Sequence, residues 1–417
     1  MHDVLVIGAG PAGLYTALRT AEEGLDVVVL EDHEVVGVPT HCTGLVSGET
    51  NSLYKIPEEV VLNRPSACLV VSPAGRVAEL EDPGEEIAVL DRAGFDRALA
   101  ASVVEAGGSI RSGCRVDHVG ARDEFVEVTT SRGERLRARV LVLACGVTFR
   151  FHGLLGSRLP SPLLHTAQLE LDAAPAEKLE VHVGRNVAPE GFAWLVPVRR
   201  GETTRLKAGV LLRGDARAHL QKFLSRLSIA SRLREIPGEP IRRLLPVAPV
   251  AKSYANRVVA VGDAAGMTKP VTGGGIFYSL LSAQFAAETL VEALAADDLS
   301  AGQLSRYEVR WRERLMPEIR TSRRFRGMLA GLTDREWDRF VAALASVEVQ
   351  SVIKQKARFN WHASLFFPLL KQPGIKSILL RSFFRFFPIR YAWPSNIHGS
   401  NGRIVPRPFL GRVFVFA

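Results

Sequence analysis

The first thirty-one residues of the chain follow the order strand, glycine-rich turn, helix, strand. Residues 3–7 are an apolar run rich in Val and Ile, which is typical of a buried strand. Three glycines come next with the spacing G-x-G-x-x-G: Gly8, Gly10 and Gly13. Residues 12–23 predict a helix, and residues 26–31 predict a second strand. This succession predicts an α/β unit with a ligand site at the N-terminus of its helix.

Each glycine has a separate physical task in such a turn. Gly8 permits the tight turn from strand to helix, Gly10 lets a pyrophosphate approach the backbone, and Gly13 lets the helix pack closely on the strand. The helix N-terminus presents free N–H groups and the positive end of its dipole to the phosphates. Glu31, at the end of the second strand, can accept hydrogen bonds from an adenosine ribose. The unit therefore predicts a dinucleotide site.

Charge is unevenly distributed along the chain. The net charge of the 417 residues is +9, but residues 301–417 hold 21 Lys and Arg against 7 Asp and Glu, whereas residues 1–300 hold 32 against 37. Four cysteines show neither a C-x-x-C pair nor metal-ligand spacing, which favours a reducing cytoplasm without disulfides, and no metal site is expected. We expect no signal peptide, because the first strand begins at residue 3, and no membrane-spanning helix.

Two segments after the first unit contain candidate site residues. Residues 37–48 form a loop rich in Gly, Pro and Thr, which leaves the carboxyl end of the sheet and is expected to lie over the nucleotide. Cys42 is its one reactive side chain, although a small residue in a tight turn is an equal explanation. Asp91 predicts the N-cap of a helix over residues 92–106. Arg92 in its first turn either reaches a cofactor phosphate or sugar, or is an exposed helical arginine.

The middle of the chain predicts an antiparallel sheet. Residues 165–213 alternate between apolar and polar side chains in the manner of strands. Within them, Phe192, Trp194 and Val196 share one face because of the period of two. From the residues alone, this aromatic face belongs either to the core or to an apolar pocket.

A second glycine-rich turn follows a short apolar strand at residues 258–261. Asp263 stands at the end of that strand, where a carboxylate can bind hydroxyl groups. Residues 273–275 are three glycines before a predicted helix over residues 276–295, and their N–H groups make a second region of positive partial charge. Two such regions in one chain suit a long cofactor with two ends.

These motifs together resemble the FAD-binding domain of aromatic hydroxylases and related flavoproteins. That resemblance rests on GAGPAG at residues 8–13 with Glu31, on the helix that begins with Arg92, and on GDAAG at residues 262–266. Two inner motifs resemble those of geranylgeranyl reductases: P-x-x-C-x-G at Pro39, Cys42 and Gly44, and F-x-W-x-V-P at Phe192, Trp194, Val196 and Pro197. The resemblance covers about residues 1–300. The chain departs from it at Val196, where an aromatic residue is usual, at Thr43, where Gly is frequent, and at Cys145, where many members have Asp.

The resemblance implies noncovalent FAD and a prenyl lipid whose carbon–carbon double bonds are saturated. The residues implied to hold FAD are Gly8, Gly10, Pro11, Ala12, Gly13, Glu31, Cys42, Gly44, Arg92, Gly262, Asp263, Pro270, Gly273, Gly274 and Gly275. Those implied to bind the isoprenoid are Phe192, Trp194, Val196 and Pro197. Reduced flavin N5 would deliver hydride to one alkene carbon, and Cys42 or water would supply the proton to the other. The electrons would come from NAD(P)H or from a reduced carrier, such as an electron-donor protein.

The expected fold is α/β with an α+β second lobe. A Rossmann-like FAD-binding domain with a parallel sheet is expected over residues 1–64, 88–164 and 240–300. An antiparallel-sheet substrate domain is expected over residues 65–87 and 165–239. Residues 301–417 are expected to form a basic, aromatic and mostly helical C-terminal region.

Three other functions remain open from the sequence. A monooxygenase or halogenase on the same fold would use a flavin hydroperoxide in place of hydride transfer. A membrane-surface flavoprotein would pass electrons to a partner or a quinone. Nucleic-acid binding by the basic tail is disfavoured, because the tail is rich in Leu, Ile and Phe.

The C-terminal tail predicts attachment to the inner face of a membrane, with the protein otherwise cytoplasmic. Residues 349–417 contain eleven basic residues and no acidic one, with Phe pairs at 366–367, 383–384 and 386–387. Phe rings can enter the headgroup boundary while Lys and Arg stay with anionic phosphates. The alternative is that the aromatic residues fill the core of a C-terminal lobe.

Overall fold

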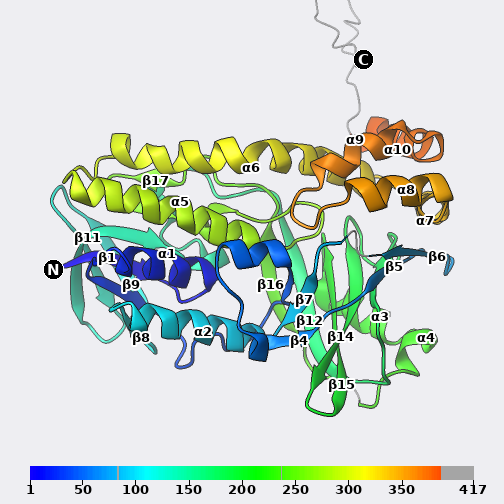
Figure 1. Ribbon diagram of the computed structural model, residues 1–417, viewed down its shortest axis with the longest axis horizontal. Helices are drawn as coiled ribbons and strands as arrows, with labels where there is room; N and C mark the ends of the chain where they lie inside the picture. Colours follow the sequence, from blue (N-terminus) through cyan, green and yellow to red (C-terminus); the bar gives the residue numbers. More distant parts are fainter. Residues whose placement is uncertain (82–83, 236, 387–417) are drawn as a thin grey trace, which may run out of the picture.

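The computed structural model describes residues 1–81, 84–235 and 237–386 and forms two sheets side by side under a layer of helices (Figure 1). The first sheet has five parallel strands, in the order β8 (Ser109–Arg111), β2 (Val27–Leu30), β1 (His2–Ile7), β11 (Arg135–Leu143) and β18 (Val258–Ala260). Antiparallel strands extend it: β9 (Val116–Ala121), β10 (Val126–Thr130) and β17 (Tyr254–Ala255). All of Val27–Leu30 is buried, as expected of a parallel strand covered on both faces.

Helices pack around this parallel sheet. α1 (Pro11–Ala21) begins at the glycine turn with Gly10 as its N-cap and Pro11 in its first turn, where the missing N–H of proline costs nothing. α5 (Ile276–Ala295) packs against α1, and α6 (Ala301–Ala330) packs against α5. α2 (Arg92–Glu105) lies on the other side of α1, with Asp91 at its N-cap. The predicted α/β unit with a parallel sheet is therefore confirmed.

The second sheet is antiparallel except at one pair of strands. Its order is β16 (Ile241–Pro246), β12 (Leu163–Asp172), β15 (Thr203–Leu212), β14 (Phe192–Arg200), β13 (Leu179–Val183), β5 (Ala67–Val71) and β6 (Val77–Glu81), with β13 and β5 parallel. α3 (Ala216–Leu224) covers one face of this sheet, and α4 (Leu227–Ala230) follows it. The prediction placed residues 240–300, and with them β16, in the FAD-binding domain. In the structure β16 pairs with β12 and is the edge strand of the second sheet. The other domain limits stay predictions.

Short elements connect the two sheets. Three strands make a small sheet of their own: β3 (Leu45–Ser47), β7 (Ile87–Leu90) and β4 (Val61–Asn63). Single 3-10 turns are η1 (Gly48–Ser52), η2 (Glu58–Val60), η3 (Gly146–Thr148), η4 (His152–Leu155) and η5 (Gly262–Ala265). We call residues 37–44, which contain Cys42, the cysteine loop. The strand β3 directly follows it, so this small sheet holds the end of that loop.

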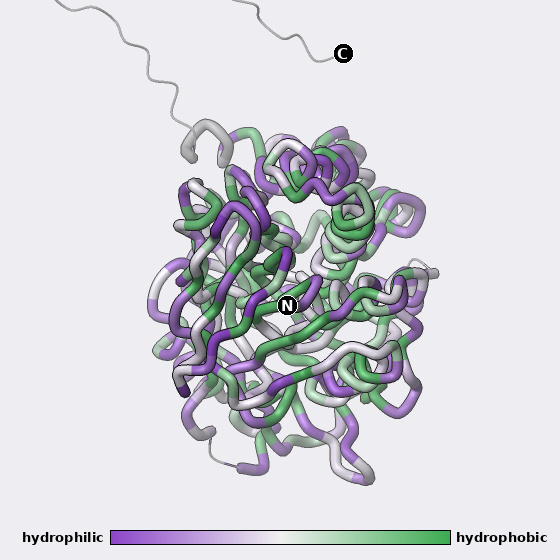
Figure 2. Tube along the Cα trace, turned by 90° about the vertical axis from the view of Figure 1, so that its left-hand side faces the viewer, coloured by the Kyte–Doolittle hydropathy of each residue, from purple (hydrophilic) through white to green (hydrophobic). Residues whose placement is uncertain are grey.

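The C-terminal region is helical, as predicted. After α6 come α7 (Asp334–Leu344), α8 (Val347–Lys356), α9 (Ala363–Lys371) and α10 (Pro373–Phe386), which gather above β5 and β6 at the right of Figure 1. In Figure 2 the helices at the top of the trace alternate between hydrophilic and hydrophobic residues, which is typical of amphipathic helices. Among the described residues, no helix is both long enough and apolar enough to cross a bilayer.

Candidate active site

A cavity of about 1170 Å³ lies between the parallel sheet, the second sheet and the C-terminal helices. It brings together most of the predicted site residues: Gly8, Gly10, Pro11, Ala12, Glu31, Cys42, Gly44, Arg92, Phe192, Trp194, Val196, Asp263, Gly273, Gly274 and Gly275. Four predicted residues do not line it: Gly13, Gly262, Pro197 and Pro270.

Gly13 and Gly262 act through packing around the glycine turn. A Cβ on Gly13 would lie 2.0 Å from the Gly8 carbonyl oxygen and 2.9 Å from Ala144 Cβ. A Cβ on Gly262 would lie 2.6 Å from Ala12 Cβ. All three distances are far inside van der Waals contact, so glycine at these positions lets α1 approach the sheet and the turn at η5.

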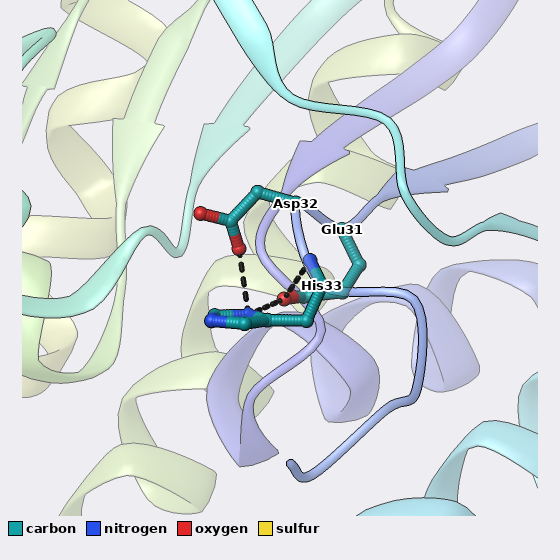
Figure 3. A group of neighbouring side chains, drawn as sticks. All are labelled: Glu31, Asp32 and His33. Carbon is teal, nitrogen blue, oxygen red and sulfur yellow. Dashed lines mark hydrogen bonds and ion pairs between the residues drawn. The ribbon is translucent and has the colours of Figure 1, made fainter. Parts of the chain in front are cut away.

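Glu31 lies where the second strand ends, next to Asp32 and His33 (Figure 3). Its carboxylate also holds the glycine turn. Its Oε2 accepts a hydrogen bond from the Ala9 N–H at 2.7 Å, and its Oε1 lies 2.5 Å from His33 Nδ1. Burial raises the pKa of Glu31, but hydrogen bonds from Asp32, the Ala9 N–H and His33 outweigh that effect and lower it. An ionised carboxylate at this edge suits the hydroxyl groups of a ribose.

Arg92 reaches the cavity from the first turn of α2, next to the cysteine loop. Its Nη2 donates to both carboxylate oxygens of Asp96, at 2.8 and 3.1 Å. Burial disfavours the guanidinium charge, but Asp96 and Cys42 outweigh it and raise the pKa of Arg92. Its buried Nε has no hydrogen-bond partner among the described residues. A buried, unpartnered donor on the cavity wall fits an anionic or carbonyl group of a cofactor.

The cysteine loop is fastened to the cavity face of the second sheet. Lys207 in β15 is only 1 % exposed, and its Nζ donates to the carbonyl oxygens of Thr43 and Leu90, each at 2.9 Å. Thr43 Oγ1 donates to Gln168 Oε1 at 2.6 Å. Burial lowers the pKa of Lys207 to about 8, although Glu170 and Cys42 oppose this shift. Thr43, which departs from the family pattern, therefore has a structural partner.

The second glycine turn closes the same cavity from the other side. Burial raises the pKa of Asp263 to about 6, with Arg92 opposing. Lys269 is 4 % exposed and lies against the glycines, since a Cβ on Gly274 would come 2.7 Å from its Cε. Burial lowers the pKa of Lys269 to about 7, against the effect of three glutamates: Glu85, Glu49 and Glu318. Its neighbour Pro270 faces away and accepts a hydrogen bond from Arg326 through its carbonyl.

Lys269 also ties this turn to the C-terminal region. Its Nζ donates to the Phe359 carbonyl oxygen at 3.0 Å and to Asn360 Oδ1 at 3.2 Å. Asn360, which is fully buried, donates in turn to Ser47 Oγ at 2.8 Å and to Glu49 Oε2 at 2.9 Å. We call these contacts the Lys269–Asn360 clasp. It holds the segment between α8 and α9 over the cavity.

The aromatic face of β14 lies on the cavity wall, and the ring of Trp194 lies against the backbone of β15. A Cβ on Gly209 would come 2.2 Å from the Trp194 indole. Phe192 follows with its ring centroid 5.8 Å from that of Trp194. Pro197 lies on the other face of the strand by the period of two, and its carbonyl accepts a hydrogen bond from Asn63 at 2.8 Å.

Beyond the aromatic face, the cavity continues as an apolar channel. Its floor comes from alternate residues of three strands of the second sheet: Val70, Val181, Val183, Phe192, Trp194 and Val196. We call the residues of the C-terminal region that cover it the roof: Leu329, Leu332, Trp337, Phe340, Leu344 and Phe359. The C-terminal region, for which the sequence indicated no role in the site, thus covers one side of the channel.

Three functional features escaped the sequence analysis: Lys207, the Lys269–Asn360 clasp and the roof. Lys207 and Lys269 interrupt runs of apolar residues, in LKAGVLL and MTKPV, and a lone lysine inside an apolar run is the signal that could have marked them. No such signal marks the roof, because apolar residues of an amphipathic helix look alike whether they face a core or a channel.

Comparison with known proteins shows which families the chain resembles. Two family models match parts of the chain: the FAD binding domain over residues 3–51 and the lycopene cyclase protein family over residues 201–354. Digeranylgeranylglycerophospholipid reductase 1 of Methanopyrus kandleri is 31 % identical over 363 residues, which cover 83 % of this chain and 95 % of the relative. The corresponding reductase of Methanosarcina acetivorans is 29 % identical and covers 84 % and 90 %.

Solved structures share the fold at lower identity. A geranylgeranyl bacteriochlorophyll reductase-like protein from Thermoplasma acidophilum superposes with a TM-score of 0.75 at 21 % identity, over 93 % of this chain and 97 % of that one. A halogenase in complex with FAD superposes with a TM-score of 0.66 at 15 % identity, over 93 % and 91 %. At these identities the likeness shows the fold alone.

The sequence relatives decide between the flavoproteins that share this fold. The predicted FAD cofactor is confirmed by the matching FAD-binding domain, and the predicted reductase is favoured over a halogenase by relatives of about 30 % identity. These relatives match along almost their whole length. The chain therefore belongs to the geranylgeranyl reductase family of FAD-dependent oxidoreductases.

Proposed function

We propose that the protein uses reduced FAD to saturate carbon–carbon double bonds of a prenyl lipid. The observation that carries this proposal is one continuous cavity that joins the dinucleotide turn to an apolar channel. An unactivated alkene is apolar, so it binds where apolar side chains surround it. Anaerobic incubation with dithionite and a geranylgeranyl lipid should add one pair of hydrogens per bond, measured by mass spectrometry. Product that forms only with oxygen would favour a monooxygenase or halogenase.

The residues present at both glycine turns fit FAD. Gly8, Gly10 and α1 suit the pyrophosphate, Glu31 suits the ribose, and the unpartnered Arg92 Nε offers a buried donor. The N–H groups of residues 273–275 at the start of α5 favour negative charge. Reduced FAD, when bound, supplies the hydride. The electron donor is proposed to be NAD(P)H or a reduced carrier protein.

Cys42 is proposed as one source of the proton, with water as the other. Cys42→Ser replaces the thiol with a hydroxyl group of similar size. It therefore tests whether the thiol or water is the source of the proton. If the thiol donates, reduction of the prenyl lipid should slow by roughly 10²-fold or more while FAD content stays constant. Stopped-flow oxidation of the reduced flavin by substrate measures the step. Cys68→Ser is the matched control, because Cys68 also lines the cavity but lies on β5. A change of less than twofold in Cys42→Ser would assign the proton to water.

The lipid substrate requires contact with a membrane, and we infer that α9 and α10 provide it on the inner face. Phe366 is buried and stacks on Phe325 with 3.9 Å between centroids, so it belongs to the core. Phe367 is 55 % and Leu380 41 % exposed, and three basic residues on these helices are exposed with them: Lys371, Lys376 and Arg381. The Phe pairs at 383–384 and 386–387 lie outside the residues whose side chains are described.

Flotation with liposomes tests this attachment. Binding should require anionic lipid and weaken with salt, because each basic residue near such a surface contributes ~1 kcal/mol. Phe367→Glu combined with Leu380→Glu should reduce flotation while FAD content stays unchanged. Val104→Glu on α2, where Val104 is 58 % exposed, is the matched control and should float like the unmodified protein. Equal binding to neutral and anionic liposomes would contradict the attachment.

A further inference from the structure

We propose that the α7 part of the roof, Trp337, Phe340 and Leu344, meets Val70 and Val183 of the floor and closes the far end of the channel. We call these residues the end wall, which limits the length of the prenyl chain. This inference rests on the proposed function and adds a specificity determinant to it. The three α7 residues have the spacing i, i+3, i+7, so they share one face of the helix. They are 8 %, 5 % and 6 % exposed, and all three line the cavity.

The wall lies at the end of the channel that is remote from the dinucleotide turn. The cavity runs along one face of the second sheet. It extends from β12, where Gln168 holds the cysteine loop, to β5, where Val70 lies. Four steps between neighbouring strands separate β12 and β5, which corresponds to roughly 19 Å at the usual strand spacing. In Figure 1, α7 and β5 stand at the opposite end of the molecule from α1 and β1. A prenyl chain that extends from the cysteine loop along this channel meets α7 last.

Hydrogen bonds hold the wall in place against the second sheet. The Asp334 carboxylate accepts from the Arg185 N–H at 2.6 Å and from the Asn186 side chain at 2.5 Å. Asp338 Oδ1 accepts from the Ala74 N–H at 2.9 Å, on the turn between β5 and β6. Arg185 Nε donates to the Leu332 carbonyl oxygen at 2.9 Å. Because α7 is fastened to both loops that flank the channel, the wall cannot recede without breaking several of these bonds.

A fixed apolar wall discriminates by volume. A chain that is one isoprene unit too long must buckle or leave methyl groups outside the channel, and even single methylene groups change binding in an apolar pocket by roughly tenfold or more. A shorter chain leaves part of the channel unfilled and gives up apolar contact. The wall therefore makes affinity rise with chain length up to a limit and then fall.

Binding to the FAD-loaded protein tests the wall without turnover. Geraniol, farnesol and geranylgeraniol are titrated, and tryptophan emission reports the dissociation constant of each alcohol. Val70→Phe narrows the channel opposite α7, so affinity for geranylgeraniol should fall roughly tenfold or more, while affinity for geraniol should change less than twofold. Val77→Phe is the matched control, because Val77 is 50 % exposed on the neighbouring strand β6.

A second variant is expected to raise the maximum chain length that the channel accepts. Phe340→Ala removes a ring from the wall and should let geranylfarnesol, one isoprene unit longer, bind as tightly as geranylgeraniol does to the unmodified protein. Phe366→Ala removes a ring from the same apolar cluster but not from the cavity lining. It should lower the melting temperature and leave the dependence on chain length unchanged. FAD content and thermal melting show which variants are folded.

The outcomes separate this inference from the proposed function. A dependence on chain length that is equal in the wall variants and their controls overturns the end wall, even if the protein reduces prenyl lipids. A shift of the length limit in Val70→Phe or Phe340→Ala, without any alkene reduction by the unmodified protein, supports the wall and contradicts the reductase. Absence of binding for every prenyl alcohol overturns both.

Discussion

Gly13→Val is expected to yield protein without FAD. The added Cβ would sit 2.0 Å from the Gly8 carbonyl oxygen, and neither the strand end nor the helix start can move away without losing the turn. The helix N-terminus would then no longer face the phosphates. The purified variant should lack the flavin absorbance of the unmodified protein and should not take up added FAD. We expect the largest effect of any substitution discussed, a complete loss of bound FAD.

Two further variants show whether the loss comes from the cofactor site or from misfolding. Gly302→Val places the same side chain in the first turn of α6, where its Cβ meets nothing closer than Ser300 Oγ at 3.6 Å, and FAD content should stay unchanged. Gly10→Ala adds a Cβ that has no protein atom within 4 Å, so the chain should fold normally. FAD binding should nevertheless weaken, because the methyl group occupies the approach of the pyrophosphate. Full FAD content in Gly13→Val would contradict the assignment of this turn.

Trp194→Ala is expected to lose most alkene reduction and to keep FAD. The indole lies over Gly209 on the channel floor, so its removal widens the channel there by the size of an aromatic ring. Loss of an aromatic ring from an apolar contact costs about 3 kcal/mol when the ring is fully enclosed. If that contact is made with the substrate, kcat/KM on a prenyl lipid should fall by roughly two orders of magnitude. The flavin spectrum and its reduction by dithionite should stay as in the unmodified protein.

Trp194→Phe separates a substrate contact from a contribution to the core. It keeps an aromatic ring over Gly209 and should recover most of the lost kcat/KM. A purely structural tryptophan would instead give a lower melting temperature in Trp194→Ala with turnover per bound FAD unchanged. A lower melting temperature with unchanged turnover would mean that the substrate contacts Phe192 and the residues beyond it, and not Trp194.

Local sequence patterns predicted the parts of the site that depend on local geometry. The glycine turn, Glu31 at a strand end and the glycines before α5 are each determined by residues within about a dozen positions, and the structure brings them to one cavity. The shared face of Phe192 and Trp194 followed from the period of a strand. The prediction that these residues bind FAD and lipid goes beyond their positions and awaits the experiments above.

Parts of the site that depend on long-range contacts could not be predicted in this way. Lys207 meets the cysteine loop from more than 160 positions away, and Lys269 meets Asn360 from about 90. The pairing of β16 with β12 could not be predicted, because β12 lies far earlier in the chain. Nothing in the sequence marked Trp337 and Phe340 as cavity residues, since only the arrangement of α7 over β5 and β13 leaves open space beside them.

The Lys269–Asn360 clasp bears on the order in which the holoprotein is assembled. A ribosome delivers the glycine turn first and Asn360 some 350 residues later, and chains begin to fold from the N-terminus during synthesis. Until Asn360 emerges, the cavity has no cover from the segment between α8 and α9, and FAD can enter from that side. Once the clasp is made, the same path is closed by a buried network of hydrogen bonds to Ser47 and Glu49. If FAD enters from this side, loading after synthesis requires that these hydrogen bonds open.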